Sequence, residues 1–245
     1  MNSDRAIIRP RREKGETILG PDAIMVAIPS DLSYMVDLAR AERVAPKSLS
    51  PFRLYSAKRE GNPLVALAGP LLGAPQAVMV LEKLIALGAE RIWVLGWCGS
   101  LQPSLTIGNL VIPTTALCEE GTSAHYQVIE EKRQTSPLLN GRIADALARA
   151  RMPFTKGPVW TTDAIYRETE EKVTAYGKRG FLGVEMEMSA LITVAAYRSV
   201  ELAGLLIVSD EVASLRWHNG VGSEALAESC KEAGKLLLDV CMDGR

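Results

Sequence analysis

The stretch GLLIVSD, residues 204–210, is a continuous apolar run that ends in a hydroxyl residue and a carboxylate. Its Leu, Ile and Val content is typical of a strand that is covered on both faces. The same pattern recurs in AIMVAIP (23–29), PLVALAG (63–69), RIWVLGW (91–97) and NLVIPT (109–114). Segments of helical periodicity separate these runs, so the sequence predicts an α/β fold with a mostly parallel sheet.

Three segments place apolar residues at helical spacing: 77–88, 139–150 and 226–240. Gly88 stands where a glycine would cap the end of the first of these helices. The chain has 245 residues, of which 47% are apolar, and this suffices for one compact core. No repeat or linker interrupts it. We therefore expect one domain over residues 21–245, preceded by a basic N-terminal arm over residues 1–20.

The charge balance argues against several classes of partner. The chain carries 28 basic and 29 acidic residues, so no global field would attract nucleic acid or an anionic membrane. No run approaches the ~18 apolar residues of a membrane span. The cysteines are far apart and lack zinc-site spacing, which favours reduced thiols and no metal. The sequence predicts a soluble, cytoplasmic protein.

Four predicted strand ends carry small or polar residues, and ligands bind at such carboxyl ends in α/β sheets. They are IPSD (28–31), GWCGS (96–100), GVEME (183–187) and VSDE (208–211). Asp210 follows a buried strand, where apolar surroundings favour the protonated form of a carboxyl group and suit it to donate a proton. The alternative is that Asp210 caps the next helix or turn.

Glu185 and Glu187 lie two residues apart in a largely apolar segment. If the strand ends there and Glu187 begins a helix, one carboxylate can face a ligand while the other binds the protein. A carboxylate can accept hydrogen bonds from two neighbouring sugar hydroxyls. An internal ion pair with an arginine is an equal alternative.

Three further features are weaker candidates. Trp160 could stack on a planar heterocycle, although tryptophan is more often a core residue. The glycines of GWCGS (96–100) could let backbone N–H groups approach an anion or a sugar. His125 is a secondary candidate, since a lone histidine is more often structural.

In combination, these segments resemble the nucleoside phosphorylase family, which includes purine nucleoside phosphorylases, uridine phosphorylases and methylthioadenosine/S-adenosylhomocysteine nucleosidases. The resemblance covers residues 24–240 and is carried by GWCGSL, IGNLVIPT, VWTTDAIYRET, GVEMEMSAL and LLIVSDE. It implies a single three-layer α/β domain with a central mixed, partly closed β-sheet flanked by helices. It also implies cleavage of the bond between a nucleobase and ribose, no cofactor, and a homo-oligomer (a dimer or a hexamer) with shared active sites.

The resemblance also implies residue roles. Met186 and Glu187 match the pair whose carboxylate holds the ribose 2′ and 3′ hydroxyls. Asp210 matches the acid that protonates N7 of a departing purine, so purines are slightly preferred over uridine. The residues expected on the base side are Trp160, Thr161 and Glu185.

The match fails at the acceptor site. Phosphate-using members place an arginine soon after the first strand and another just before the glycine loop. Here no arginine lies between the first strand and Arg40, and Val94 occupies the second place. Trp97 replaces a small hydroxyl residue. The residues expected to form the site for phosphate or water are Ser30, Asp31, Trp97, Cys98 and Gly99. The residues that could contact an anion instead are Lys47, Arg53 and Arg91.

Three functional hypotheses follow. Phosphorolysis, with inorganic phosphate as co-substrate, is favoured because it is the commoner reaction in the family. Hydrolysis is the alternative, with Asp31 as the general base. A catalytically degenerate nucleoside-binding protein is the third, although it would not need the proton donor Asp210. A dinucleotide-dependent oxidoreductase is disfavoured, because no GxGxxG follows a predicted strand.

Overall fold

The computed structural model describes residues 6–44, 52–58 and 64–242. Ten strands form one sheet in the order β10-β9-β6-β7-β8-β5-β1-β4-β3-β2. Their bounds are β1 (Asp22–Val26), β2 (Glu42–Val44), β3 (Arg53–Ala57), β4 (Val65–Gly69), β5 (Arg91–Ser100), β6 (Leu110–Glu119), β7 (Phe154–Thr162), β8 (Gly183–Glu185), β9 (Glu201–Glu211) and β10 (His218–Asn219). The helices are α1 (Pro29–Ala39), α2 (Ala74–Ala86), α3 (Pro137–Ala150), α4 (Glu170–Lys178), α5 (Met188–Arg198) and α6 (Glu224–Met242).

The sheet closes on itself through β5, which pairs with β8 and also with β9. The strands β9, β6, β7, β8 and β5 thus form a ring, and β1, β4, β3 and β2 extend from it. Pairings such as β5–β9 are parallel, whereas β5–β8 and β6–β9 are antiparallel. The expectation of a mixed, partly closed sheet is confirmed. The longest pairings, β5–β9 and β6–β7, are parallel, as strand–helix alternation predicts, whereas shorter antiparallel pairings occur both within the ring and outside it, as in β2–β3 and β3–β4.

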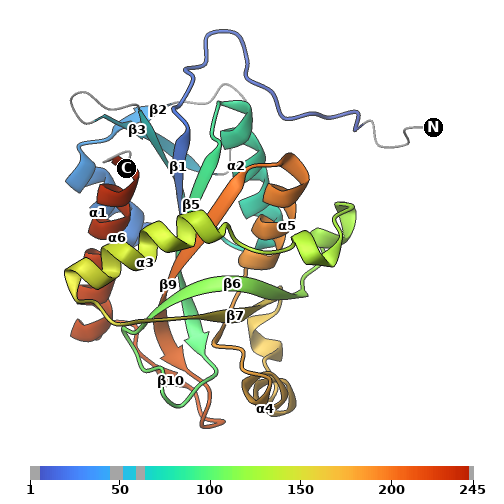
Figure 1. The fold of residues 1–245 in the computed structure, drawn as a ribbon, viewed down its shortest axis with the longest axis vertical. Helices are drawn as coiled ribbons and strands as arrows, with labels where there is room; N and C mark the ends of the chain where they lie inside the picture. Colours follow the sequence, from blue (N-terminus) through green and yellow to red (C-terminus); the bar gives the residue numbers. More distant parts are fainter. Residues whose placement is uncertain (1–5, 45–51, 59–63, 243–245) are drawn as a thin grey trace.

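Helices cover the sheet on two sides, which gives the three layers (Figure 1). On one side α2 and α5 pack on a core that includes Leu81 and Leu191. On the other side α1, α3 and α6 pack on a core that includes Leu147 and Leu237. Successive residues of a strand point to opposite faces, so each buried strand contributes to both cores. This explains the continuous apolar runs in the sequence.

The predicted elements are present with shifted ends. The first strand ends at Val26, because Pro29 begins α1, where the fixed φ of proline suits the first helical turn. Gly88 follows α2 with a φ of 106°, as the capping prediction requires. The last helix begins at Glu224. None of the described helices is long and apolar enough to cross a membrane.

The end of the basic arm is anchored on the domain. The Leu19 side chain is buried, and its N–H donates to the carbonyl of Leu87. Lys83 of α2 forms a buried ion pair with Glu16 at 2.7 Å. The first described residues of the arm are not anchored in this way, since Ile7 is fully exposed. The boundary at residue 20 stays a prediction.

Candidate active site

A cavity of about 550 Å³ lies at the carboxyl ends of β5, β8 and β9. This is a volume typical of small-molecule sites. Its polar lining consists of the residues Trp97, Cys98, Gly99, Tyr166, Glu168, Glu185, Glu187, Ser209, Asp210 and Trp217. Apolar groups such as Ile28, Leu71 and Val184 form the remaining walls. All four predicted strand ends therefore contribute to one cavity, although IPSD contributes only Ile28.

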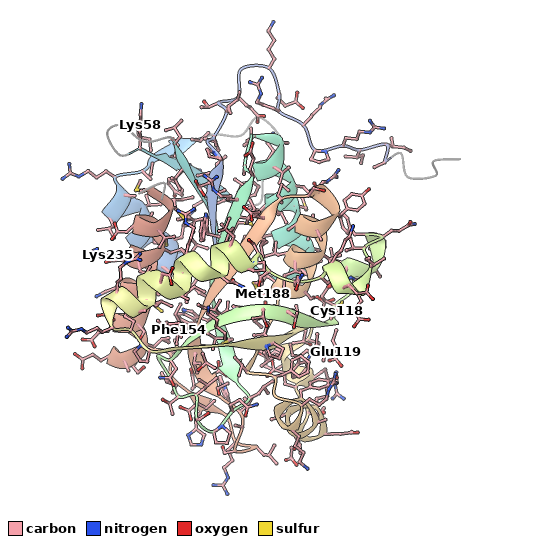
Figure 2. All side chains as sticks on the ribbon, in the orientation of Figure 1. Lys58, Cys118, Glu119, Phe154, Met188 and Lys235 are labelled. Carbon is pink, nitrogen blue, oxygen red and sulfur yellow. The ribbon has the colours of Figure 1, made fainter. Side chains whose placement is uncertain are left out.

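A larger groove of about 1300 Å³ lies elsewhere, between α3 and α6. Lys235 and Asp239, which line it, form an ion pair with each other at 2.7 Å (Figure 2 labels Lys235). The groove lies on the outer helices, far from the strand ends. We therefore place the functional site in the smaller cavity.

Asp210 reaches the cavity because of a β-bulge. Cys98 pairs with Val208 and Gly99 pairs with Asp210, so Ser209 is an extra residue on β9. A bulge turns the following side chain in a new direction. The Asp210 carboxylate accepts hydrogen bonds from the Ser209 hydroxyl at 2.6 Å and from the Trp217 indole N–H at 3.0 Å.

Gly99 makes room for this carboxylate. A Cβ atom at position 99 would lie 3.1 Å from the Asp210 Oδ2 and 3.3 Å from a methyl group of Val184. Both contacts are tighter than side chains usually tolerate. The glycine of GWCGS therefore serves close packing against Asp210.

Glu185 and Glu187 have different partners. β8 ends at Glu185, and Glu187 precedes the first residue of α5. The Glu185 carboxylate accepts the backbone N–H groups of Glu187 and Met188, both at 2.6 Å, and is hydrogen-bonded to the Thr161 hydroxyl. The Glu187 carboxylate accepts the N–H of Gly73 at 2.6 Å. The expectation that the strand ends here and a helix follows Glu187 is confirmed.

Burial changes the protonation of this pair. Loss of solvent and then the nearby Glu187 charge raise the pKa of Glu185 to about 8. Burial also raises the pKa of Glu187. No arginine is among the partners found for Glu185 in the described structure, so its partners are the protein's hydroxyl and amide groups instead.

Trp160 is not where the sequence suggested, and this is a correction. Its side chain is fully buried with Leu101 and Phe181, and it does not line the cavity. Its indole N–H donates to Glu119, which Figure 2 labels at the end of β6. Trp160 packs instead in a buried cluster with Val173 and Tyr176 of α4.

Thr161 is also fully buried and absent from the cavity wall. Its hydroxyl bonds Glu185 and accepts the N–H of Ser189, so it holds the start of α5. The residues that line the cavity from this motif come later: Ile165, Tyr166 and Glu168. The sequence signal for them was an apolar–aromatic pair and a carboxylate just after the strand, and the sequence analysis did not use it.

Only some of the residues predicted to form the site for phosphate or water line the cavity. Trp97, Cys98 and Gly99 line the cavity, but Ser30 and Asp31 do not. Asp31 is buried in the first turn of α1, where it accepts the indole N–H of Trp97 at 3.1 Å. Burial raises the pKa of Asp31. Asp31 therefore does not line the cavity. The expectation that it acts as the general base for hydrolysis is wrong.

No lysine, arginine or histidine lines the cavity among the residues that the structure describes. Arg91 lies at the opposite end of β5 and binds both oxygens of Asp22, at 2.8 and 2.6 Å. Arg53 is exposed at the start of β3, and His125 is exposed in a short 3₁₀-helix. Neither lines the cavity. Lys47 lies outside the described residues.

Glu168 is one of the lining residues whose roles the sequence did not indicate. It is half-buried and follows the short 3₁₀-helix Ile165–Arg167. Within the described residues, no hydrogen bond or ion pair to its carboxylate is present. Burial and then the charge of Asp210 raise the pKa of Glu168 to about 7. No group of three or more potential metal ligands is found in the part of the chain that the structure describes.

A partly closed sheet with carboxylates at its strand ends and a small-molecule cavity defines an α/β protein with a candidate ligand site. The sequence model of the phosphorylase superfamily matches residues 21–241. The chain therefore belongs to the phosphorylase superfamily, and the predicted family is confirmed.

Relatives and solved structures agree with this membership. The chain is 23% identical to a guanosine phosphorylase from Halorubrum lacusprofundi, over 86% of each protein. It is 29% identical to a DeoD-type purine nucleoside phosphorylase from Caldanaerobacter subterraneus, over 64% of this chain and 67% of that protein. Its fold resembles purine nucleoside phosphorylase from Toxoplasma gondii, with a TM-score of 0.82, 20% identity and 92% coverage of both chains. Uridine phosphorylase from Vibrio fischeri also gives a TM-score of 0.82, at 22% identity, over 94% of this chain and 99% of that one.

Proposed function

We propose that the protein cleaves the N-glycosidic bond between a nucleobase and ribose. The observation that carries this proposal is that Asp210 and Glu187 line one cavity from two different elements. The N–H of Gly73 donates to Oε1 of Glu187, and a carboxylate has about four acceptor positions. Ribose hydroxyls can therefore bind Glu187 while the base lies beside Asp210.

The chemistry divides between these residues. As the C–N bond breaks, its electron pair goes to the base and positive charge develops on the ribosyl group. A proton from Asp210 to the base neutralises the leaving group, which general acids accelerate typically by 10²–10⁴-fold. A purine offers N7 for this proton, and a pyrimidine has no N7. We therefore favour purine nucleosides, in agreement with the names of the guanosine and purine phosphorylase relatives.

We favour inorganic phosphate as the acceptor, because the named relatives are phosphorylases. A phosphate oxygen would form the new bond to C1′ and yield ribose 1-phosphate, without any cofactor. Among the described residues that line the cavity, no positively charged side chain is present to bind phosphate. We propose that a neighbouring subunit of a homo-oligomer supplies it, from the segment that holds Lys47 and Arg53.

Hydrolysis is the second candidate, and the cation-free, carboxylate-rich lining favours it. Two unit charges of the same sign 6 Å apart repel by about 3 kcal/mol at an effective dielectric constant of 20. Each ionised carboxylate of the cavity would therefore weaken the binding of phosphate. Water carries no such penalty and would yield free ribose.

The test follows base release from inosine, guanosine, adenosine, uridine and methylthioadenosine, with and without phosphate. Release that depends on phosphate supports phosphorolysis, and equal release without phosphate supports hydrolysis. Failure to cleave any of these nucleosides would contradict the proposed function.

Asp210→Asn tests the proton donor. The amide keeps the size of the side chain but cannot donate a carboxyl proton, so we expect kcat for inosine to fall by roughly 10²–10⁴-fold with nucleoside binding retained. Asp145→Asn, an exposed change on α3, is the matched control and should leave kcat unchanged. Equal activities of the two variants would remove Asp210 from the mechanism.

A further inference from the structure

Trp97 is an aromatic residue near the carboxyl end of β5 that lines the cavity. It shares its face of the strand with Trp93 and Leu95, which belong to the core beneath α1, α3 and α6. Trp97 packs against the same core but is only half-buried. Its indole therefore extends from the core to the wall of the cavity.

The hydrogen bonds of Trp97 decide which part of the indole faces the cavity. Its N–H donates to Oδ2 of Asp31 and to Sγ of Cys230, both at 3.1 Å. Asp31 lies in the first turn of α1 and Cys230 lies in α6, and both are buried. Neither residue lines the cavity. The N–H therefore points away from the cavity, and the indole offers ring carbons to a ligand.

The end of β5 lies between the two carboxylates of the proposed reaction. β5 pairs with β8, which leads to Glu187, and with β9, which carries Asp210. Gly99, two residues beyond Trp97, is close to both Val184 of β8 and Asp210. With the ribose on Glu187 and the base beside Asp210, the bond that breaks crosses the end of β5.

We propose that the indole ring of Trp97 stabilises the positive charge that develops on the ribosyl group during cleavage. This inference rests on the proposed cleavage of nucleosides. As the C–N bond breaks, its electron pair leaves with the base, and positive charge spreads over C1′ and the ring oxygen of the sugar. The face of an aromatic ring attracts a cation, and tryptophan does so most strongly. The intact sugar is uncharged, so this attraction acts on the transition state and not on the bound nucleoside.

Asp31 acts through Trp97 as a positioning residue. A carboxylate that accepts the indole N–H holds the plane of the ring, and it polarises the ring towards higher electron density. The Ser30 hydroxyl donates to the other oxygen of Asp31 at 3.3 Å. Ser30 and Asp31 do not line the cavity, but these hydrogen bonds connect them to it through Trp97.

Two substitutions test the role of the ring in turnover. Trp97→Leu keeps an apolar side chain without an aromatic face, so kcat for inosine should fall by roughly 3- to 30-fold while KM changes by less than about twofold. Trp97→Phe keeps a weaker aromatic face, and its kcat should fall less. A raised KM with unchanged kcat would mean that Trp97 only shapes the cavity, and this result would overturn the proposal.

A binding experiment tests the attraction without turnover. The probes are two uncleavable nucleoside analogues that carry the base on a carbon–carbon bond. One has a protonated nitrogen in place of the sugar ring oxygen, and the other keeps the oxygen. Titration calorimetry, at a pH below the pKa of that nitrogen, gives both affinities. The carboxylates of the cavity attract the charged probe in every variant, so only the change between variants reports on Trp97.

The ratio of the two affinities, charged over uncharged, should fall by roughly 3- to 30-fold in Trp97→Leu and by less in Trp97→Phe. Unfolded protein binds neither probe, so a loss of folded protein does not alter this ratio. If no nucleoside is cleaved, the proposed function fails, but a lower ratio in Trp97→Leu still supports the role of Trp97. An unchanged ratio in Trp97→Leu overturns that role in either case.

Discussion

Glu185 and Glu187 illustrate how the position of a residue in the chain decides the role of its side chain. Both are carboxylates of one short segment, but Glu185 ends a strand and Glu187 precedes a helix. Glu185 therefore receives the first N–H groups of α5, while Glu187, which lines the cavity, reaches across to the N–H of Gly73. Helix-start N–H groups need acceptors, and Glu185 supplies them from inside the protein.

Replacement of Glu185 separates its acceptor role from its charge. Glu185→Ala leaves two N–H groups and the Thr161 hydroxyl without their partner, so the free energy of unfolding should fall by about 3–5 kcal/mol. Glu185→Gln keeps an acceptor oxygen and should cost less than about 2 kcal/mol. Urea denaturation measures both values. Equal losses in the two variants would contradict the acceptor role.

Glu168 should also affect the pH dependence of stability. Burial raises its pKa from 4.5 to about 7, so between these values the folded protein holds a proton that the unfolded chain releases. This stabilisation is complete below about pH 4.5 and is lost as pH rises through 7. Relative to Glu168→Gln, the unaltered protein should lose up to about 2 kcal/mol between pH 5 and pH 8, after allowance for partial exposure.

Denaturation at several pH values measures this difference. Glu170→Gln, an exposed change, should give a difference from the unaltered protein that does not vary with pH. A constant difference for Glu168→Gln as well would show that Glu168 titrates at the same pH in the folded and unfolded states.

At the scale of elements, the segment between β9 and β10 controls Asp210. β10 pairs with the end of β9, and Trp217 precedes β10 and donates its indole N–H to Asp210. The bulge at Ser209 aims the carboxylate, and Trp217 holds it. Trp217 is itself 69% exposed, so this contact forms at the mouth of the cavity.

Trp217→Phe removes this N–H and keeps an aromatic ring. We expect kcat for inosine to fall by roughly 3- to 30-fold, which corresponds to the loss of one hydrogen bond to a carboxylate. Trp217→Ala removes the ring as well and should raise KM in addition. If Trp217→Phe retains full kcat, the hydrogen bond to Asp210 has no catalytic role.

At the scale of the whole molecule, closure of the ring depends on close contact between β5 and β8. A Cβ atom at Gly183 would lie 2.9 Å from the Cys98 sulfur and 3.1 Å from the Gly99 carbonyl oxygen. Gly183→Ala should therefore force the strands apart and lower the free energy of unfolding by about 1–3 kcal/mol.

Gly141→Ala is the matched control for that change. Gly141 lies within α3, and its added Cβ would meet no atom within 4 Å. Alanine is the better helix former, so this variant should gain about 0.5–1 kcal/mol. Thermal and urea unfolding measure both variants. A stabilised Gly183→Ala protein would contradict the tight closure.

The fold was largely predictable from the apolar runs, because buried strands and amphipathic helices have distinct periods. The runs located β1, β4, β5, β6 and β9. The strands β2, β3 and β7 escaped prediction because they carry exposed or polar residues such as Arg43, Arg53 and Lys156. β8 has only three residues, too few for a periodic pattern, and was expected only as the strand end at GVEME.

The sequence by itself determined the strand–helix order and the carboxylates at strand ends, because both follow from local periodicity and chain position. It could not determine that Trp160 is buried in the core, or that Ile165, Tyr166 and Glu168 line the cavity. Local spacing decides which residues share a face of a strand. Which face points into the cavity is decided by pairing between distant strands and by ring closure, and only the tertiary structure contains that information.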